Sequence, residues 1–154
     1  MKKAKSYKQT AVNWGKSQAQ ITNVLTYYGV QEIRFTFLNS RNEVICEFNY
    51  PTRVNDKDVT IGVRILWPLP SGVSDPEKAK NIAHRRLYYY LKSKFDALSD
   101  SALEFAQEFM PHLIVFDKKG GSNTLWNIIG GQYQAGLISG QQGELKMLPD
   151  KVGQ

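Results

Sequence analysis

The chain has 154 residues, of which 42% are apolar and 22% charged, and its 20 Lys and Arg against 14 Asp and Glu give a formal net charge of +6. This composition excludes collagen, coiled coils and bulk disorder, and the length supports an ordinary core without disulfides or metals. No apolar run is long enough to span a bilayer, and no segment near the lysine-rich start has the pattern of a signal peptide, so we expect a soluble cytoplasmic protein. With one Cys and two His, no zinc site or other cofactor is expected.

The chain is expected to divide into a basic N-terminal arm over 1–16, one domain over 17–129 and a Gly- and Gln-rich tail over 130–154. Residues 6–13 are predicted to form a short strand, followed by a turn at Trp14. Ser17 then has the pattern of a helix N-cap, and Gly29 supplies a left-handed stop. We therefore expect a short amphipathic helix between these two residues.

The next segments alternate apolar and polar residues with a period of two, which predicts strands with one buried face. The three predicted strands are 33–37, 44–50 and 59–67. A tight hairpin over 39–42 joins the first two, and a longer loop over 51–57 joins the second and third. The sequence thus predicts an antiparallel meander with Cys46 on its buried face.

A strong helix start follows, because Asp75 can act as N-cap and Pro76 suits the first helical position. Apolar residues at helical spacing predict a helix over 75–98, long enough to cross the sheet. A further helix is expected from Ser99 to Met110, then a short strand over 112–116. A flexible loop over 118–123 and one last helical turn capped by Thr124 complete the domain, and the last ~20 residues are expected to be mobile or to order on a partner.

These elements predict an α+β fold: a three- to four-stranded antiparallel meander packed on one long amphipathic helix, with a short N-terminal helix and an additional C-terminal helix. The charge excess lies in two places. Residues 1–16 carry five lysines and no acid, and residues 76–96 carry six basic side chains against two acidic ones.

The candidate site is a stripe of basic residues on the long helix. A spacing of seven residues returns almost to the same side of a helix, so the three cations Lys78, Arg85 and Lys92 share one face. Basic groups interleaved with aromatic rings suit phosphate neutralisation and base stacking. The full set of predicted nucleic-acid-binding residues is Lys78, Arg85, Arg86, Tyr88, Tyr89 and Lys92, with Lys2, Lys3, Lys5 and Lys8 of the arm. The competing interpretation is a solvated helix face that serves solubility.

Two other features favour simpler interpretations. The polar sheet face, with Arg34, Glu47 and Arg64 among its residues, is expected to be a wet surface with cross-strand Arg and Glu pairs. His84 is interpreted as a surface residue and Cys46 as an inert core thiol. No convergent acid, base or nucleophile set is found, so we expect no enzyme activity.

Two resemblances add expectations. The order of helix, three-strand meander and helix, with Asp75 to Ala83 opening the last helix, resembles double-stranded RNA-binding domains, although Pro76 and Glu77 stand where that family has lysines. Residues 10–126 also resemble a family of small proteins frequent in bacteriophages and prophages. The resemblance is carried by an ordered set of short segments: Lys16-Ser17, Tyr28-Gly29, Ile65 to Pro70, Arg85-Arg86 and Leu113-Ile114-Val115. That second resemblance implies a phage genome and a host cytoplasm, and no particular activity.

The expected function is therefore non-catalytic nucleic-acid binding, as an accessory protein of phage DNA or RNA metabolism. The partner is DNA or RNA, with no membrane. The alternative is a protein-binding module that inhibits or redirects a host enzyme, using the same helix face against an acidic protein or ordering its tail on binding. A phage structural or assembly component is the third possibility.

Overall fold

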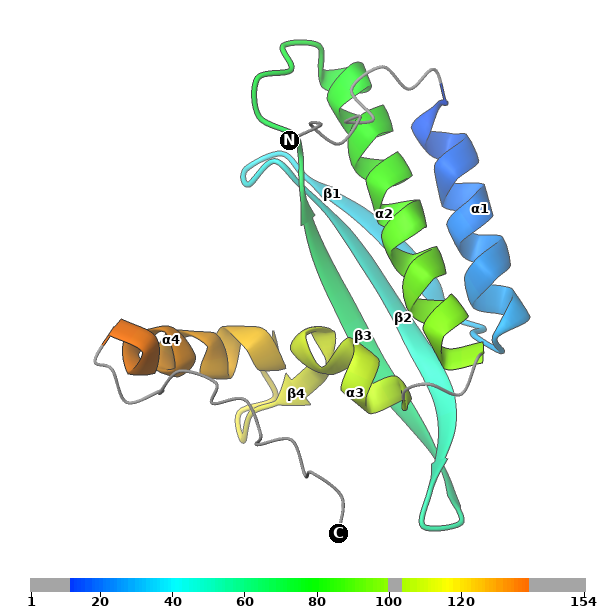
Figure 1. Cartoon of the computed structure of the whole chain (residues 1–154), viewed down its shortest axis with the longest axis vertical. Helices are drawn as coiled ribbons and strands as arrows, with labels where there is room; N and C mark the ends of the chain where they lie inside the picture. The colour runs from blue at the N-terminus through cyan, green and yellow to red at the C-terminus, as the bar shows by residue number, and fades with distance from the viewer. Residues whose placement is uncertain (1–11, 100–103, 139–154) are drawn as a thin grey trace, which may run out of the picture.

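The structure is a computed structural model that describes residues 12–99 and 104–138. Two helices, α1 (Trp14–Tyr27) and α2 (Pro76–Ser99), lie side by side across one face of a three-stranded antiparallel sheet (Figure 1). The strands are β1 (Ile33–Leu38), β2 (Glu43–Val54) and β3 (Lys57–Pro68), in the order β1-β2-β3. The predicted α+β fold, with a meander packed on one long helix, is confirmed.

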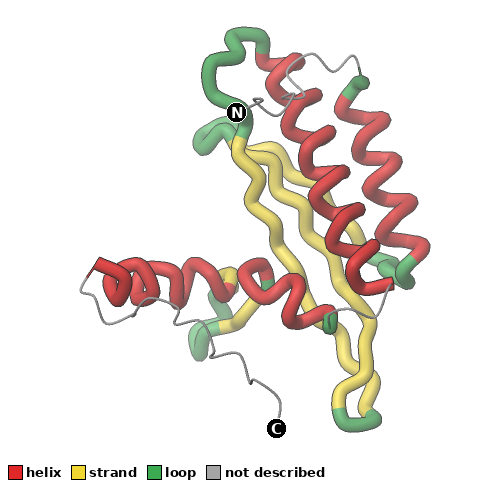
Figure 2. The backbone as a smooth tube through the Cα atoms, in the orientation of Figure 1, coloured by secondary structure: helices red, strands yellow, loops and turns green. Residues whose placement is uncertain are grey.

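A smaller subdomain follows α2. It consists of α3 (Phe105–Phe109), a 3₁₀ turn η2 (Met110–His112), a two-stranded sheet of β4 (Ile114–Phe116) and β5 (Ser122–Thr124), and α4 (Leu125–Ile138). α3 lies near the C-terminal end of α2, whereas α4 projects away from the main sheet (Figure 2). Leu113 bridges to Val63 of β3, which attaches the subdomain to the sheet.

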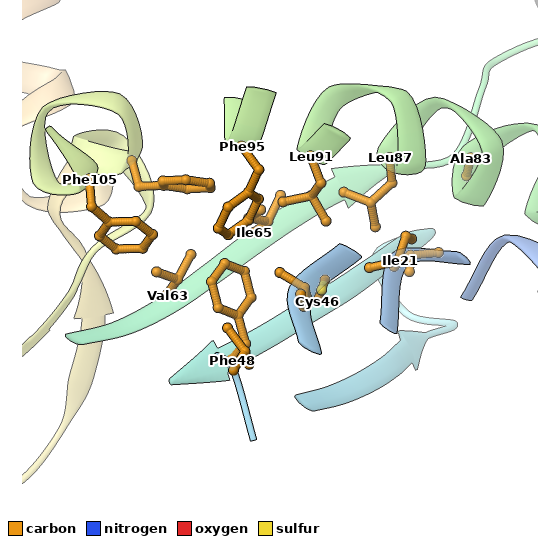
Figure 3. Packing of buried hydrophobic residues seen from close by; sticks show 14 residues of the cluster. Ile21, Cys46, Phe48, Val63, Ile65, Ala83, Leu87, Leu91, Phe95 and Phe105 are labelled. Atoms are coloured by element: carbon orange, nitrogen blue, oxygen red, sulfur yellow. The ribbon is translucent and has the colours of Figure 1, made fainter. Parts of the chain in front are cut away.

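The core lies between the two helices and the sheet. Figure 3 shows Leu87, Leu91 and Phe95 of α2 directed at strand residues that include Phe48 and Ile65. Each of these α2 side chains is fully buried, and such burial contributes about 1.5–3 kcal/mol per residue. Phe95 is the centre of an aromatic cluster, with its ring centroid 4.7 Å from that of Tyr28 and 5.3 Å from that of Phe109.

The start of α2 was predicted correctly. The Asp75 carboxylate accepts a hydrogen bond from the backbone N–H of Glu77 at 3.0 Å, as an N-cap does. The strand predictions also hold, since Val44, Cys46 and Phe48 are buried while their neighbours along β2 lie on the other face. Gly29 has φ +90°, which confirms the predicted stop after α1.

The start of α1 was predicted wrongly. The helix begins at Trp14, where a turn was expected, and its N-cap is Asn13, whose side chain accepts from the N–H of Gly15 at 2.8 Å. Ser17, the predicted cap, is fully buried inside the helix. The expected strand over 6–13 lies largely outside the described residues, and its last residue is this cap.

The loop predicted over 51–57 is also wrong. β2 and β3 pair as far as Val54 and Lys57, and the two residues between them, Asn55 and Asp56, both have positive φ, which a tight hairpin turn requires. Pro51 is tolerated inside β2 because the pairing with β1 stops at Phe48, so that edge of β2 carries no partner strand at Pro51.

The last part of the domain is more ordered than expected. Residues 118–123 belong to a hairpin that ends in β5, and the predicted last turn is a helix that continues to Ile138 through Gly130 and Gly131. The helix predicted from Ser99 begins at Phe105 among the described residues. The expectation of a mobile tail falls mainly on residues 139–154, which lie outside the described ranges.

Candidate nucleic-acid interface

The predicted basic stripe lies on the outer side of α2. Lys78, Tyr89 and Lys92 are exposed, whereas Arg85, Arg86 and Tyr88 are half-buried. The buried residues Ala83, Leu87 and Leu91 point to the sheet from the opposite side of the helix. At 1.5 Å per residue, Lys78 and Lys92 stand about 21 Å apart along the helix, with Arg85 midway.

Arg85 is held in place by contacts from both helices. Its Nη1 donates to Oε1 of Gln20 on α1 at 2.5 Å, and its Nη2 donates to the hydroxyl of Tyr89 at 2.9 Å. The guanidinium carbon is 5.0 Å from the ring centroid of Tyr88 and 4.7 Å from that of Tyr89, within cation–π range. A guanidinium has five N–H donors, so these two bonds leave others for a ligand.

The two lysines of the stripe are less constrained. Lys92 forms an ion pair with Asp96 one turn away, N to O 2.9 Å, and both side chains are about half exposed. The hydrogen bond and charge of Asp96 raise the pKa of Lys92. Exposed pairs of this type contribute little to stability, so a phosphate can replace Asp96 at small cost. Within the described ranges, the Lys78 ammonium has no ion pair or hydrogen bond.

The other basic residues of α2 differ in whether their charged groups can contact a ligand. Arg86 is rotated by about 100° from Arg85 and lies at the edge of the face. Lys94 is mostly buried and bonded to Glu108 at 2.9 Å, so it is a structural cation. Lys80 lies over the ring of Phe37, 4.4 Å from its centroid. The predicted arm residues Lys2, Lys3, Lys5 and Lys8 lie outside the described residues.

The outer face of the sheet holds a second basic cluster. Glu47 on β2 accepts from Arg34 Nε on β1 at 2.7 Å and from Arg64 Nε on β3 at 2.8 Å. Burial alone would raise the pKa of Glu47, but the hydrogen bonds and charges of Arg64 and Arg34 outweigh it and leave the pKa below its ordinary value. The expected cross-strand pairs are therefore present.

Part of this sheet face is covered by other residues and is not exposed to solvent, however. The β4–β5 hairpin crosses it, with Ile114 against Gly62, where an added Cβ would lie 3.2 Å from the Ile114 side chain. Arg64 also donates to Ser122 Oγ of β5 at 3.1 Å. Sequence reasoning missed this cover because β5 is only three residues long and lies in a stretch typical of a loop.

The side chains of His84 and Cys46, two residue types that often act in catalysis, are buried. His84 is 3% exposed and not a surface residue as predicted, since its Nδ1 donates to the Lys80 carbonyl at 2.8 Å and its Nε2 accepts from Gln18. Burial is the main cause of its lowered pKa. Cys46 is fully buried, and that burial, with the charge of Glu47, raises its pKa to about 12. Among the described residues, no group of three His, Cys, Asp or Glu side chains could hold a metal ion.

An apolar surface on α4 was not anticipated. This helix contains no charged residue, and its exposed side chains include Trp126, Ile128, Ile129 and Tyr133. The signal in the sequence is the set of apolar residues Leu125, Trp126, Ile128 and Ile129, placed directly after the helix-capping Thr124. The hydroxyl of Thr124 accepts from the backbone N–H of Asn127 at 3.3 Å.

Over residues 12–99 and 104–138, the structure contains no helix with the length and apolar character required to cross a membrane. Comparisons with protein-family models, with curated proteins and with solved structures found no match to this chain. The function is therefore inferred from the side chains of the site.

Proposed function

We propose that this protein binds nucleic acid without catalysis, through the outer face of α2. The observation that carries the proposal is Arg85, whose guanidinium is fixed by Gln20 and Tyr89 while it contacts the rings of Tyr88 and Tyr89. An arginine that is already ordered loses less conformational entropy when it binds a phosphate. Lys78 and Lys92 extend the positive face by one heptad in each direction.

The acidic groups near this face lie at its two ends and leave its central part positive. Glu77 accepts from the indole of Trp14 and approaches Lys80, so its charge is directed toward α1 and not along the stripe. Asp96 pairs with Lys92 at the far end. The central part of the face therefore presents Arg85 and two tyrosines, which suits a phosphate with an adjacent base or sugar.

The test is binding of fluorescein-labelled DNA and RNA, single-stranded and duplex, measured by anisotropy at about 50 mM salt. The triple variant Lys78→Ala, Arg85→Ala, Lys92→Ala should fold and bind at least about tenfold more weakly. The matched control is Arg53→Ala, Lys57→Ala, Lys118→Ala, which removes the same charge from exposed positions away from α2. No binding in any strand form, or equal losses in both triples, would refute the proposal.

A second candidate, a protein-binding module, is favoured by the surface of α4. Exposed contiguous apolar groups are typical of protein interaction sites, and an uncharged helix gives no attraction for a polyanion. If this candidate is correct, a partner retained from nuclease-treated lysate should be lost with Trp126→Ser, Tyr133→Ser, while Tyr27→Ser, at another exposed tyrosine, retains it. Oligonucleotide binding should be unchanged in both variants.

A further inference from the structure

A groove on the outer face of the sheet, across the sheet from α1 and α2, has the features of a second ligand site. It consists of two adjoining cavities of about 380 and about 500 Å³. Both are lined by Arg34, Glu47, Arg64 and Ser122, so the ion cluster of the sheet lies where they meet. The β4–β5 hairpin and the first turn of α4 also contribute lining residues.

The charge in the groove is unbalanced. Glu47 is the acidic residue that lines the larger cavity, against the three cations Arg34, Arg41 and Arg64. Its carboxylate is shared by Arg34 and Arg64, so it neutralises one of the two. Arg41, in the turn between β1 and β2, makes no side-chain hydrogen bond or ion pair within residues 12–99 and 104–138. The larger cavity therefore carries a net positive charge.

The position of the charges favours an anion in the larger cavity. Glu32 lines the smaller cavity and accepts from Asn49, which makes that end less favourable for negative charge. Arg34 is the most exposed member of the cluster, with 72% of its side chain accessible against 24% for Arg64. Arg34 and Arg41 are thus the cations with donors available to a ligand, and Arg64 positions Glu47 from the other side.

The floor of the larger cavity is less polar than its rim. Ile45 and Leu66, on neighbouring strands, face the cavity beside Thr36. A pocket with an apolar floor and a few convergent polar groups suits a ligand that has both a flat organic part and an anionic group. A guanidinium recognises phosphate through two parallel N–H donors in a fixed plane, whereas an ammonium acts as a point charge without this geometric selectivity.

We propose that this groove binds a phosphate-bearing nucleotide unit, with the phosphate on Arg34 and Arg41 and the base over Ile45 and Leu66. The same chemistry is presented by a free nucleotide and by one unit of a nucleic-acid strand. The site lies on the opposite face of the sheet from the α2 stripe and goes beyond the function proposed above, so either can hold without the other.

The experiment is isothermal titration calorimetry of the full chain at low salt with AMP, adenosine, inorganic phosphate and thymidine hexanucleotide. AMP should bind more tightly than phosphate, and adenosine most weakly. Arg41→Ala should weaken AMP binding by about tenfold or more, because a charge-assisted hydrogen bond is lost. The control Arg53→Ala, at an exposed arginine near the other end of β2, should leave AMP binding unchanged.

The outcomes separate the alternatives. Tighter binding of the hexanucleotide than of AMP, lost in Arg41→Ala, assigns the site to a strand, and the reverse order assigns it to a free nucleotide. The proposal is overturned if neither AMP nor the hexanucleotide binds at millimolar concentration, or if adenosine binds as tightly as AMP. It is also overturned if Arg41→Ala and Arg53→Ala have the same effect on AMP binding. The triple variant of α2 should keep AMP binding, which distinguishes failure of this site from failure of the helix face.

Discussion

The guanidinium of Arg85 on α2 donates a hydrogen bond to Oε1 of Gln20 on α1, 65 positions away in the sequence. This bond ties the central cation of the basic face to the neighbouring helix. The orientation of Arg85 is thus a property of the packed pair of helices and not of α2 alone.

The first prediction concerns that bond. Gln20→Ala should leave the charge of the face unchanged and weaken oligonucleotide binding by about threefold, because ordering one long side chain costs about 0.5–1.5 kcal/mol. Anisotropy titrations measure the affinity, and thermal unfolding checks that the fold is intact. Gln18→Ala, on the same helix but bonded to His84, is the control. An unchanged affinity for Gln20→Ala would show that the ordering of Arg85 does not matter.

The second prediction concerns the aromatic cluster. Phe95→Ala should lower the free energy of unfolding by about 3–5 kcal/mol, since a fully buried ring is removed from the junction of both helices, the sheet and α3. Urea denaturation measures the change. Tyr27→Ala, which removes an aromatic ring that is 83% exposed, should change the same quantity by less than about 0.5 kcal/mol. Similar losses in the two variants would contradict the central position of Phe95 in the core.

The third prediction is a pH dependence that arises from His112. Burial, together with the charge of Lys94, lowers its pKa to about 4, while Tyr90 Oη lies 2.7 Å from Nε2. The unfolded chain therefore takes up a proton below about pH 6.5 that the folded chain excludes until about pH 4. Since the unfolded state binds more protons in this window, the free energy of unfolding should fall as the pH is lowered.

The size of the effect is about 2 kcal/mol between pH 7 and pH 5 for this residue. His84, whose pKa burial also lowers, acts in the same direction. Urea denaturation as a function of pH should show a reduced slope for His112→Gln, and a smaller slope again when His84→Gln is added. A wild-type stability that rises on acidification through this window would contradict the neutral state of these rings in the folded protein.

The fourth prediction concerns Cys46. Because its pKa is raised to about 12 and the side chain is inaccessible, the thiol should not react with Ellman's reagent at pH 8 in the folded protein. It should react fully in 6 M guanidinium chloride, at the rate of a small-molecule thiol in the same solution. Rapid labelling of the folded protein would place β2 in a different register.

The predictable parts of the fold depend on short-range patterns. The alternation along β2 and β3 requires only that one sheet face be buried, and Asp75 caps a helix through its own next residues. The same alternation also places Arg34, Glu47 and Arg64 on one face, so the cross-strand ion pairs follow from the register. The basic stripe of α2 follows from helical periodicity alone.

The parts that were missed depend on contacts between distant segments. Asn13 and Ser17 are both good N-cap residues, and the start of α1 at Trp14 is supported by Asn81 on α2, whose side chain accepts the backbone N–H of Trp14 at 2.8 Å. His84 is buried by α1, including Gln18, which the periodicity of α2 does not report. α4 passes through Gly130 and Gly131, two residues of low helix propensity, and Gly130 is covered by the indole of Trp126.

The most direct test of the central claim is the salt dependence of oligonucleotide binding by the wild type and by the Lys78→Ala, Arg85→Ala, Lys92→Ala variant. If these three side chains contact three phosphates, the slope of log affinity against log salt should be more negative in the wild type than in the variant by about 2 to 3. Equal slopes in the two proteins would contradict binding through the outer face of α2.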